Sequence, residues 1–437
     1  MRHSQSATPV LAYTPLKLLI VYLTFTLLIA LFGPTIYFNF PVQNVVIFMF
    51  LVMAVMTFGF INGVRMPLKG PKSGVKSGGV SVKKIFRVSL AIALLVLVFL
   101  TFNAYLSNNL NTDITEMGST YLDSYSGYER NSGTYDADFL IYSFSLPFNF
   151  IATIWGLYYF SSLTRLEKNL VILLLIWTIV YYVLGSGKQK QLADTAIYII
   201  SIMAVKKGVN NKSISISSII SSIIAGLMLT MAFMFILSQR YAALAVDLFN
   251  YNQKSANNIT INIDHPVFAI FGPDMGLTMS IFLSYLSQGY YGLGLATTVN
   301  HSWTYFLGFS YSLSVIANRI LGVEWVWPDT LVYQAGVQRD WGENRWHTVF
   351  THFASDFTFP GTILLFGFFA YLYARVWMSA IRYQNPYAIL MFSLLTLGAF
   401  FIPANNQLLH TPGGLITVVI VSILYLKNAR AYNERSS

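Results

Sequence analysis

Residues 43–61 read QNVVIFMFLVMAVMTFGFI, an apolar run without a charged side chain. A helix of about 20 such residues crosses the ~30 Å hydrocarbon core of a bilayer, and helices satisfy their own backbone polar groups there. The sequence therefore predicts an all-α, polytopic integral membrane protein, a single membrane domain over 1–437. Runs of the same kind recur at 16–36, 86–106, 139–160, 170–185, 191–205, 214–237, 357–376, 386–404 and 414–427.

The composition agrees with this class. Apolar residues make up 55% of the chain and charged residues only 10%, whereas soluble domains carry about 25% charged residues. The chain has no cysteine, which excludes disulfides and thiolate chemistry. The first apolar run resembles a signal peptide, but no small-residue cleavage site follows it, so we interpret it as an anchor that is retained.

Basic residues are concentrated in every second segment between the predicted membrane helices. This pattern indicates how the chain is oriented across the membrane. The link 62–85 is basic, and its side of the membrane collects most of the 27 basic residues but only two of the 17 acidic ones, Glu167 and Glu434. The positive-inside rule places this side, with both termini, in the cytoplasm. The net charge of +10 therefore needs no nucleic acid as a partner. The link 107–138 is acidic, with six acids against Arg130, and is predicted outside the cytoplasm.

One segment outside the cytoplasm, about 238–356, is far longer than the others. Its uncharged portion within 275–320 is either a further membrane hairpin or a pair of interfacial helices. Both alternatives leave the orientation of the following helices unchanged. The sequence thus predicts ten membrane helices, or twelve.

Several cations lie on the side where basic residues should be scarce. A guanidinium fork at headgroup depth suits a phosphate or diphosphate, and pairing with acids of the same segment is the alternative. LGSGKQK at 184–190 fails the phosphate-loop pattern, because Tyr182 and Gln189 stand where Gly and Ser or Thr are needed. The candidate anion-binding residues are Arg240, Arg345, Lys188, Arg339 and Arg319.

The stretch WGENRWHTVFTHFASDF at 341–357 carries titratable groups just before an apolar run. If 345–356 is helical, Arg345, His352 and Asp356 share one stripe, and Asp356 can orient His352 as a base. A helix cap with solvated polar residues is the alternative, and His347 is a substitute for His352. The spacing of the two histidines does not suit a metal, and no metal or cofactor is expected.

Aromatic and amide side chains suggest a surface for sugars. Five of the eight tryptophans fall within 303–346, more concentrated than an interfacial belt requires. Trp341 and Trp346 are candidates to stack on sugar rings, beside their default role as interfacial anchors. Asn405 and Asn406, in PANNQLLHTPGG at 403–414, are candidates to bind hydroxyls, or they cap a turn.

Three stretches together resemble the bacterial O-antigen polymerases, which join oligosaccharide repeat units. SYLSQGYYGLGLA at 284–296 resembles a segment of that family's central external region. WHTVFTHFASDFTFPG at 346–361 resembles its polar-aromatic cluster followed by Asp-Phe-Gly and a further Gly. Here Asp356, Phe357 and Gly361 match, and Thr358 replaces the first Gly. GSGKQKQ at 185–191 resembles a short external turn in which relatives often carry arginine, with Lys188 in its place.

The resemblance implies a polytopic glycosyltransferase in the bacterial inner membrane with its active site facing the periplasm. Its substrate would be an oligosaccharide on undecaprenyl diphosphate, and its partners membrane lipid and a chain-length regulator protein. Arginines can stabilise a departing diphosphate without a metal. We hypothesise that Arg240, Arg345 and Lys188 hold the diphosphate and that His352 is the base. An O-antigen ligase is the nearest alternative function, and a lipid-linked oligosaccharide flippase is a more distant one.

Overall fold

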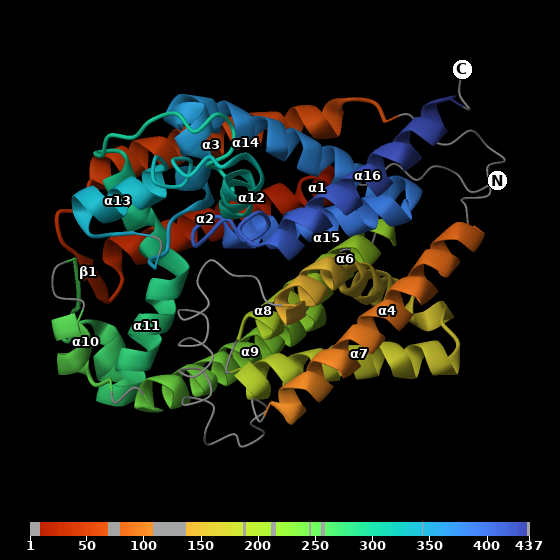
Figure 1. Cartoon of the computed structure of the whole chain (residues 1–437), viewed down its shortest axis with the longest axis horizontal. Helices are drawn as coiled ribbons and strands as arrows, with labels where there is room; N and C mark the ends of the chain where they lie inside the picture. Colours follow the sequence, from red (N-terminus) through yellow and green to blue (C-terminus); the bar gives the residue numbers. More distant parts are fainter. Residues whose placement is uncertain are drawn as a thin grey trace.

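The structure is a computed structural model that describes residues 9–68, 79–107, 137–186, 189–210, 216–243, 246–254, 258–342 and 344–434 (Figure 1). A helix lies at each of the ten apolar runs, so the prediction of an all-α membrane protein is confirmed. These helices are α2 (Thr14–Phe32), α3 (Val42–Arg65), α4 (Gly79–Leu106), α6 (Ala137–Tyr158), α7 (Arg165–Ser186), α8 (Lys190–Val209), α9 (Ile216–Ala243), α14 (Val349–Tyr383), α15 (Pro386–Phe401) and α16 (Pro412–Glu434).

Seven of the described helices are long and apolar enough to cross a membrane: α2, α3, α4, α6, α7, α11 (Pro266–Ala296) and α14. Helices α15 and α16 contain shorter apolar segments. Large apolar side chains stand exposed along the long helices, such as Val21 on α2 and Phe50 and Phe58 on α3. An apolar exterior of this extent suits acyl chains and not water. The protein is therefore a multi-pass membrane protein.

The first membrane helix is shorter than predicted. The sequence favoured helix to residue 36, but α2 ends at Phe32, because Pro34 cannot continue a helix and restricts the residue before it. The next residues form β1 (Thr35–Tyr37), which pairs antiparallel with β2 (Ile259–Ile261). This two-stranded ribbon ties the α2–α3 turn to the long segment after α9. We call the side of the bundle that carries it the ribbon side.

Helices α3 and α14 make the most extensive contact among the described helices and lie side by side (Figure 1). Gly59 and Gly63 of α3 face Gly367 and Tyr371 of α14, and a Cβ atom at either glycine would overlap a backbone carbonyl oxygen. Small residues four apart let two helix backbones approach closely within a membrane. The order of these contacts makes the two helices parallel, so both begin on the ribbon side.

Helix α11 begins and ends on the ribbon side. His265, its N-cap, lies 3.3 Å from the carbonyl oxygen of Phe32, and Asn44 donates a 2.8 Å hydrogen bond to Thr297 beyond its other end. Phe32 is the last residue of α2 and Asn44 lies in the first turn of α3, so both are next to the ribbon. In Figure 1, α11 accordingly runs across the direction of α2. Its one sharp bend is at Gly272, where φ is 75°, just before Pro273.

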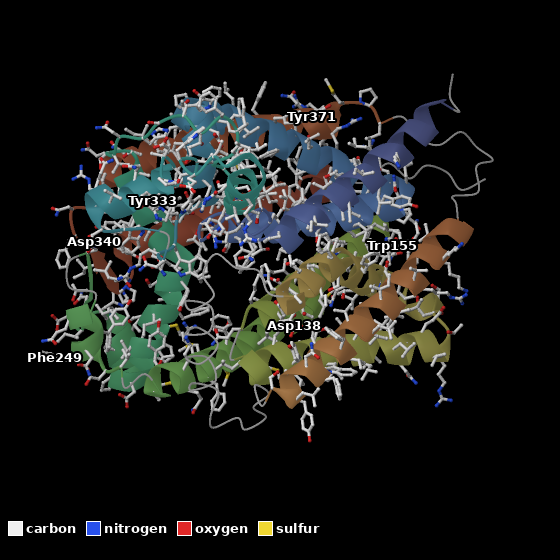
Figure 2. All side chains as sticks on the ribbon, viewed as in Figure 1. Asp138, Trp155, Phe249, Tyr333, Asp340 and Tyr371 are labelled. Atoms are coloured by element: carbon white, nitrogen blue, oxygen red, sulfur yellow. The ribbon has the colours of Figure 1, made fainter. Side chains whose placement is uncertain are left out.

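Within 275–320 the structure has the last part of α11 and one further helix. The helix that follows α11 there is α12 (Tyr311–Leu321), whose 11 residues rise only about 16 Å, half of the hydrocarbon thickness. The short helices α10 (Leu248–Lys254) and α13 (Leu331–Arg339) complete this segment, and α1 (Pro9–Ala12) and η2 (Phe160–Ser162) lie elsewhere. Figure 2 shows Asp340 and Phe249 toward the ribbon and Trp155 among the membrane helices.

The close approach of α3 and α14 is testable by adding one methyl group. We expect Gly59→Ala to lower the thermal midpoint of the detergent-solubilised protein, with a loss of about 1–3 kcal/mol for overpacking. Gly226→Ala is the matched control, because no atom of the described residues lies within 4 Å of a Cβ atom at that position on α9. The control should gain up to about 1 kcal/mol from helix propensity. Equal midpoints for the two variants would contradict the packing.

Candidate functional site

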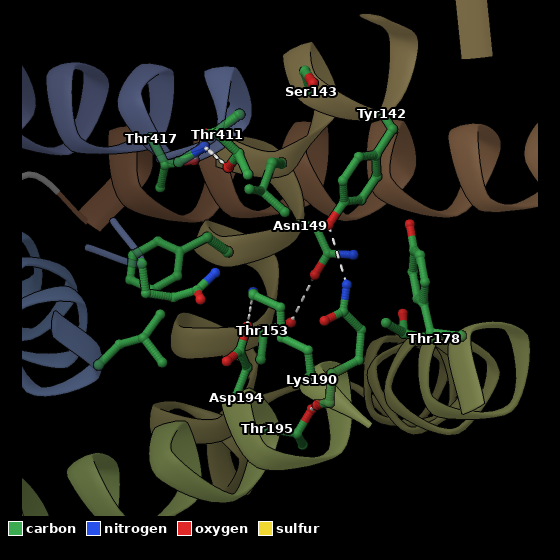
Figure 3. A pocket seen from close by; sticks show the side chains of 18 of the residues that line it. Tyr142, Ser143, Asn149, Thr153, Thr178, Lys190, Asp194, Thr195, Thr411 and Thr417 are labelled. Carbon is green, nitrogen blue, oxygen red and sulfur yellow. Dashed lines mark hydrogen bonds and ion pairs between the residues drawn. The ribbon is translucent and has the colours of Figure 1, made fainter. Parts of the chain in front are cut away.

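A cavity of about 460 Å³ lies where six helices come together (Figure 3). Side chains of α4, α6, α7, α8, α15 and α16 line it. The polar lining includes Tyr142, Asn149, Thr178, Gln191, Gln407 and Thr411. Ligand sites in proteins commonly measure about 300–1,000 Å³, so this space accepts a small molecule or one end of a larger one.

The cavity lies toward the ribbon side and extends into the bundle. Asp138 at the start of α6, Lys190 at the start of α8 and Thr411 just before α16 all line it. Helix α14 begins on the ribbon side and α15 returns, so the turn into α16 is on the ribbon side. Val349 confirms this placement, because its backbone N–H donates to the carbonyl oxygen of Ile402. Deeper residues such as Thr153 line the cavity's other end.

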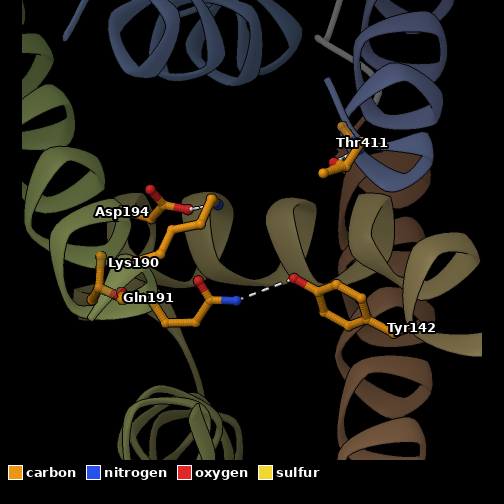
Figure 4. Close-up of polar contacts among 7 residues, drawn as sticks. Tyr142, Lys190, Gln191, Asp194 and Thr411 are labelled. Carbon is orange, nitrogen blue, oxygen red and sulfur yellow. Dashed lines mark hydrogen bonds and ion pairs between the residues drawn. The ribbon is translucent and has the colours of Figure 1, made fainter. Parts of the chain in front are cut away.

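An ion pair stands in the cavity wall. Lys190 and Asp194 are one helical turn apart on α8, and the lysine Nζ lies 2.5 Å from Asp194 Oδ2 (Figure 4). The Lys190 side chain keeps 41% of its surface exposed, whereas that of Asp194 keeps 11%. The neighbouring Gln191 donates a 3.1 Å hydrogen bond to the hydroxyl of Tyr142. An ionisable residue inside a membrane-spanning segment is costly and is therefore a candidate for a substrate or ion site.

Three buried polar atoms in the cavity wall have no hydrogen-bond partner among the described residues: Asp194 Oδ1, Gln191 Oε1 and Thr178 Oγ1. Buried polar groups in folded proteins are almost always bonded, and leaving one unbonded is costly. The aspartate and glutamine oxygens only accept hydrogen bonds. The cavity therefore suits a ligand, or water, that supplies hydrogen-bond donors such as hydroxyl groups.

Three histidines meet beside the cavity. The ring of His352 lies 6.5 Å from that of His347 and 6.2 Å from that of His410, measured between centroids. His347 Nε2 donates to the carbonyl oxygens of Trp341 and Gly342, at 3.1 and 3.2 Å. Burial lowers the pKa of His347 to about 4. Within the part of the chain that the structure describes, the buried Nδ1 atoms of all three rings have no hydrogen-bond partner.

The loop before α16 contributes residues to both the cavity and the histidine cluster. It supplies Gln407 and Thr411 to the cavity and His410 to the histidine cluster. Asn406, a candidate for binding hydroxyls, is buried and donates a 2.6 Å hydrogen bond to the carbonyl oxygen of Phe309, while Asn405 is partly exposed. In this loop, the glutamine and not the two asparagines reaches the cavity.

Comparisons with protein-family models, with curated proteins and with solved structures found no match for the chain.

Asp356 does not orient His352. Its Oδ1 accepts from the Thr304 hydroxyl at 2.5 Å and the Phe306 N–H at 2.8 Å, and its Oδ2 accepts from the Phe309 N–H at 2.7 Å. The carboxylate thus fastens the loop 303–309 to α14. His352 and Asp356 do lie four residues apart on a helix, as predicted. The hydrogen-bond donors to the Asp356 carboxylate, however, come from a loop that is distant in sequence.

Arg345 does not share a helical stripe with His352, because α14 begins only at Val349. Its guanidinium carbon lies 5.3 Å from the centroid of the Trp341 ring. Trp341 is fully buried and donates to the carbonyl oxygen of Trp346, so its ring is packed inside the protein and not offered to a ligand. Trp346 packs edge-on against Tyr285 of α11, with centroids 5.7 Å apart.

The other predicted cations lie apart from the cavity lining. Arg240, Arg319 and Arg339 occupy the last turns of α9, α12 and α13. Arg339 donates to the carbonyl oxygen of Thr298 at 3.3 Å. Lys188 lies outside the described residues. Within the described ranges, no group of three or more histidine, aspartate or glutamate residues is arranged to hold a metal ion.

Sequence reasoning missed Asp194, although the sequence carried a signal for it. Asp194 is the acidic residue within the apolar run 191–205. An ionisable side chain within a membrane span is costly unless it is paired, and it is therefore a functional candidate by default. Lys190, four residues earlier, is its partner on the same helical face.

The burial of His347 predicts sensitivity to acid. Its folded pKa of about 4 lies below the ordinary 6.5, so between these values the unfolded chain binds a proton that the folded chain does not. Stability is complete above pH 6.5 and falls as the pH drops, by up to about 3 kcal/mol near pH 4. We expect the thermal midpoint to decrease over this window.

His347→Gln keeps a donor for the Trp341 carbonyl and does not titrate, so it should make the decrease in the thermal midpoint smaller. Burial also lowers the pKa of His410 to about 4, so part of the decrease should remain. Gly226→Ala is the control, because it changes no titratable group and meets no atom of the described residues within 4 Å, and its slope should match that of the wild type. A wild-type midpoint that is constant between pH 7 and pH 4.5 would overturn the assignment.

Proposed function

We propose that the protein is a periplasm-facing glycosyltransferase that polymerises oligosaccharide repeat units carried on undecaprenyl diphosphate, a metal-independent enzyme. The observation that carries this proposal is the cavity on the ribbon side, with its hydroxyl and amide lining and its Lys190–Asp194 pair. A glycan offers many hydroxyl donors, and a diphosphate offers negative charge. The wall of the cavity carries matching groups for both.

The sequence resemblance supports the same function. Two of the stretches singled out in the sequence, GSGKQKQ and PANNQLLHTPGG, contribute Lys190, Gln191 and Gln407 to one cavity. These stretches are more than 200 residues apart in the chain, so their meeting is a property of the fold. A shared substrate site is a sufficient reason for both to carry polar residues.

Ten membrane helices with both termini in the cytoplasm make the ribbon side periplasmic. In this topology α11 begins and ends on the periplasmic side. The basic link 62–85 then faces the cytoplasm, as the positive-inside rule requires. Lipid-linked repeat units would reach the cavity from the outer leaflet of the inner membrane, with a chain-length regulator protein as a further partner.

The reaction needs a cation near the leaving diphosphate and a base near the attacking hydroxyl. Lys190 supplies a cation in the cavity, and Asp194 supplies a base. The hypothesis from sequence assigned these roles to Arg240, Arg345 and His352, which are not among the residues that line the cavity. We therefore move the proposed roles to the α8 pair.

Transport is a second candidate function, and one observation favours it. An ion pair in a cavity between membrane helices is also what a transporter uses to bind its cargo. A lipid-linked oligosaccharide flippase would bind the same ligand. A ligase, which transfers the finished glycan to a lipid acceptor, would share the chemistry of the polymerase.

Deleting the gene from its bacterium separates these functions. We expect the deletion strain to keep a core capped by a single repeat unit and to lose the ladder of longer chains. A core without any repeat unit would indicate a ligase. Repeat units accumulating on the cytoplasmic side would indicate a flippase. An unchanged ladder would contradict a role in this polysaccharide.

Filling the cavity should abolish polymerisation. Thr178 lines the cavity from α7, and we expect Thr178→Trp to remove the ladder at a normal membrane level of protein, because the indole occupies ligand space. Val180→Trp is the matched control on the same helix, where the side chain is 43% exposed on the outside. Retention of the full ladder by Thr178→Trp would separate the cavity from the function.

A further inference from the structure

The Lys190–Asp194 pair has unequal partners. Asp194 is 93% buried by the exposure of the whole residue, while the Lys190 side chain keeps 41% of its surface exposed. Lysine has a flexible four-carbon stem and a compact charge, so it can turn toward a second anion without moving its helix. The aspartate, held on the wall of α8, cannot follow it.

Asp194 presents a second oxygen to the cavity. Lys190 occupies Oδ2, and the buried Oδ1 has no hydrogen-bond partner in the described ranges. Tyr142, Gln191 and Thr411 line the cavity around the pair, and Figure 4 shows Thr411 across the opening from Asp194. A hydroxyl group entering this space can therefore donate to Oδ1 while the ion pair is still intact.

Separating the two charges changes the chemistry of the carboxylate. A buried carboxylate is tolerated when a cation neutralises it and becomes a strong proton acceptor when the cation leaves. An anionic ligand that attracts Lys190 would therefore create a base only when it is bound. The resting protein would keep that base neutralised.

We propose that the diphosphate of the lipid-linked substrate takes Lys190 from Asp194, and that the released Asp194 carboxylate is the catalytic base. This inference rests on the proposed function. It assigns two roles in one exchange, with Lys190 stabilising the leaving group and Asp194 Oδ1 accepting the proton of the attacking hydroxyl.

The step balances in a single displacement. The acceptor hydroxyl oxygen forms a bond to the anomeric carbon of the donor, and its proton goes to Asp194 Oδ1. The bond between the anomeric carbon and the diphosphate oxygen breaks, and its electron pair leaves with undecaprenyl diphosphate. Lys190 offsets that charge. The linkage is formed with inversion, and the proton returns to solvent when the product leaves.

The histidine cluster is a weaker source of the base. His352 is 4% exposed, its neighbours include the rings of His347 and His410, and it is absent from the cavity lining. For His352 to reach a substrate, α14 would have to separate from the loop before α16. Asp194 needs no such movement.

Two substitutions separate the two roles. We expect Asp194→Asn to lower the yield of polymer in the complemented deletion strain by about 100-fold or more, through loss of the base. The purified variant should bind undecaprenyl diphosphate at least as tightly as the wild type, because Lys190 is released. Lys190→Gln should bind it about 10-fold or more weakly. Lys207→Gln, at the opposite end of α8, is the control and should change neither value.

A purely structural ion pair predicts a different pattern. The exchanged variant Lys190→Asp with Asp194→Lys restores the pair, and Lys190→Gln with Asp194→Asn removes both charges without leaving one unpaired. A structural role predicts a ladder from both double variants. We expect no ladder from either at normal membrane levels. A wild-type ladder from Asp194→Asn or from either double variant would overturn the inference.

Failure of the proposed function would look different again. In that case the deletion strain would keep its ladder, and the wild-type protein would show no preference for undecaprenyl diphosphate over undecaprenol. If deletion removes the ladder and Asp194→Asn restores it, the function stands and the base is elsewhere.

Discussion

The contact between α3 and α14 is the constraint on which the rest of the structure depends. A membrane offers little hydrophobic gain for bringing two helices together, so close association needs backbones that can approach each other. Gly59 and Gly63 provide this approach against Gly367 and Tyr371. Helix α14 continues on both sides of a kink at Thr358, where φ is 61°, and its packing on α3 fixes the part from which its ribbon-side half, α15 and the loop before α16 extend.

The carboxylate of Asp356 extends this frame beyond the membrane helices. It holds three donors from the loop 303–309, and within that loop Tyr305 and Phe306 adopt positive φ angles of 52° and 63°. Such angles cost free energy in residues with a side chain, and the carboxylate helps to hold them. The sequence marked Asp356 as important but attributed its value to a histidine on the same helix. Its partners are about 50 residues away, so helical spacing alone could not identify them.

The cavity shows how polar groups persist between apolar helices. Apolar side chains of α6, α7 and α8 face the bilayer or pack in the core. Tyr142, Thr178 and Asp194, one from each of these helices, face the cavity that they line together. The ion pair on α8 is local, since its members are one turn apart. The cavity is not local, because α15 and the loop before α16 must close it. Trp155, buried and bonded through Nε1 to the carbonyl oxygen of Pro386, anchors α6 to the start of α15.

The sequence alone determined the fold class and the position of all ten apolar helices, because hydrocarbon thickness and backbone hydrogen bonding dictate the length and polarity of each run. It also contained the Lys190–Asp194 spacing and the Gly59–Gly63 spacing, which are readable along one helix. Only the tertiary structure decided that α11 stays on the ribbon side, that Asp356 serves a distant loop, and that the α8 pair faces Thr411. Those contacts join residues far apart in the chain, and the pattern of a single helix carries no information about which other segment will pack against it.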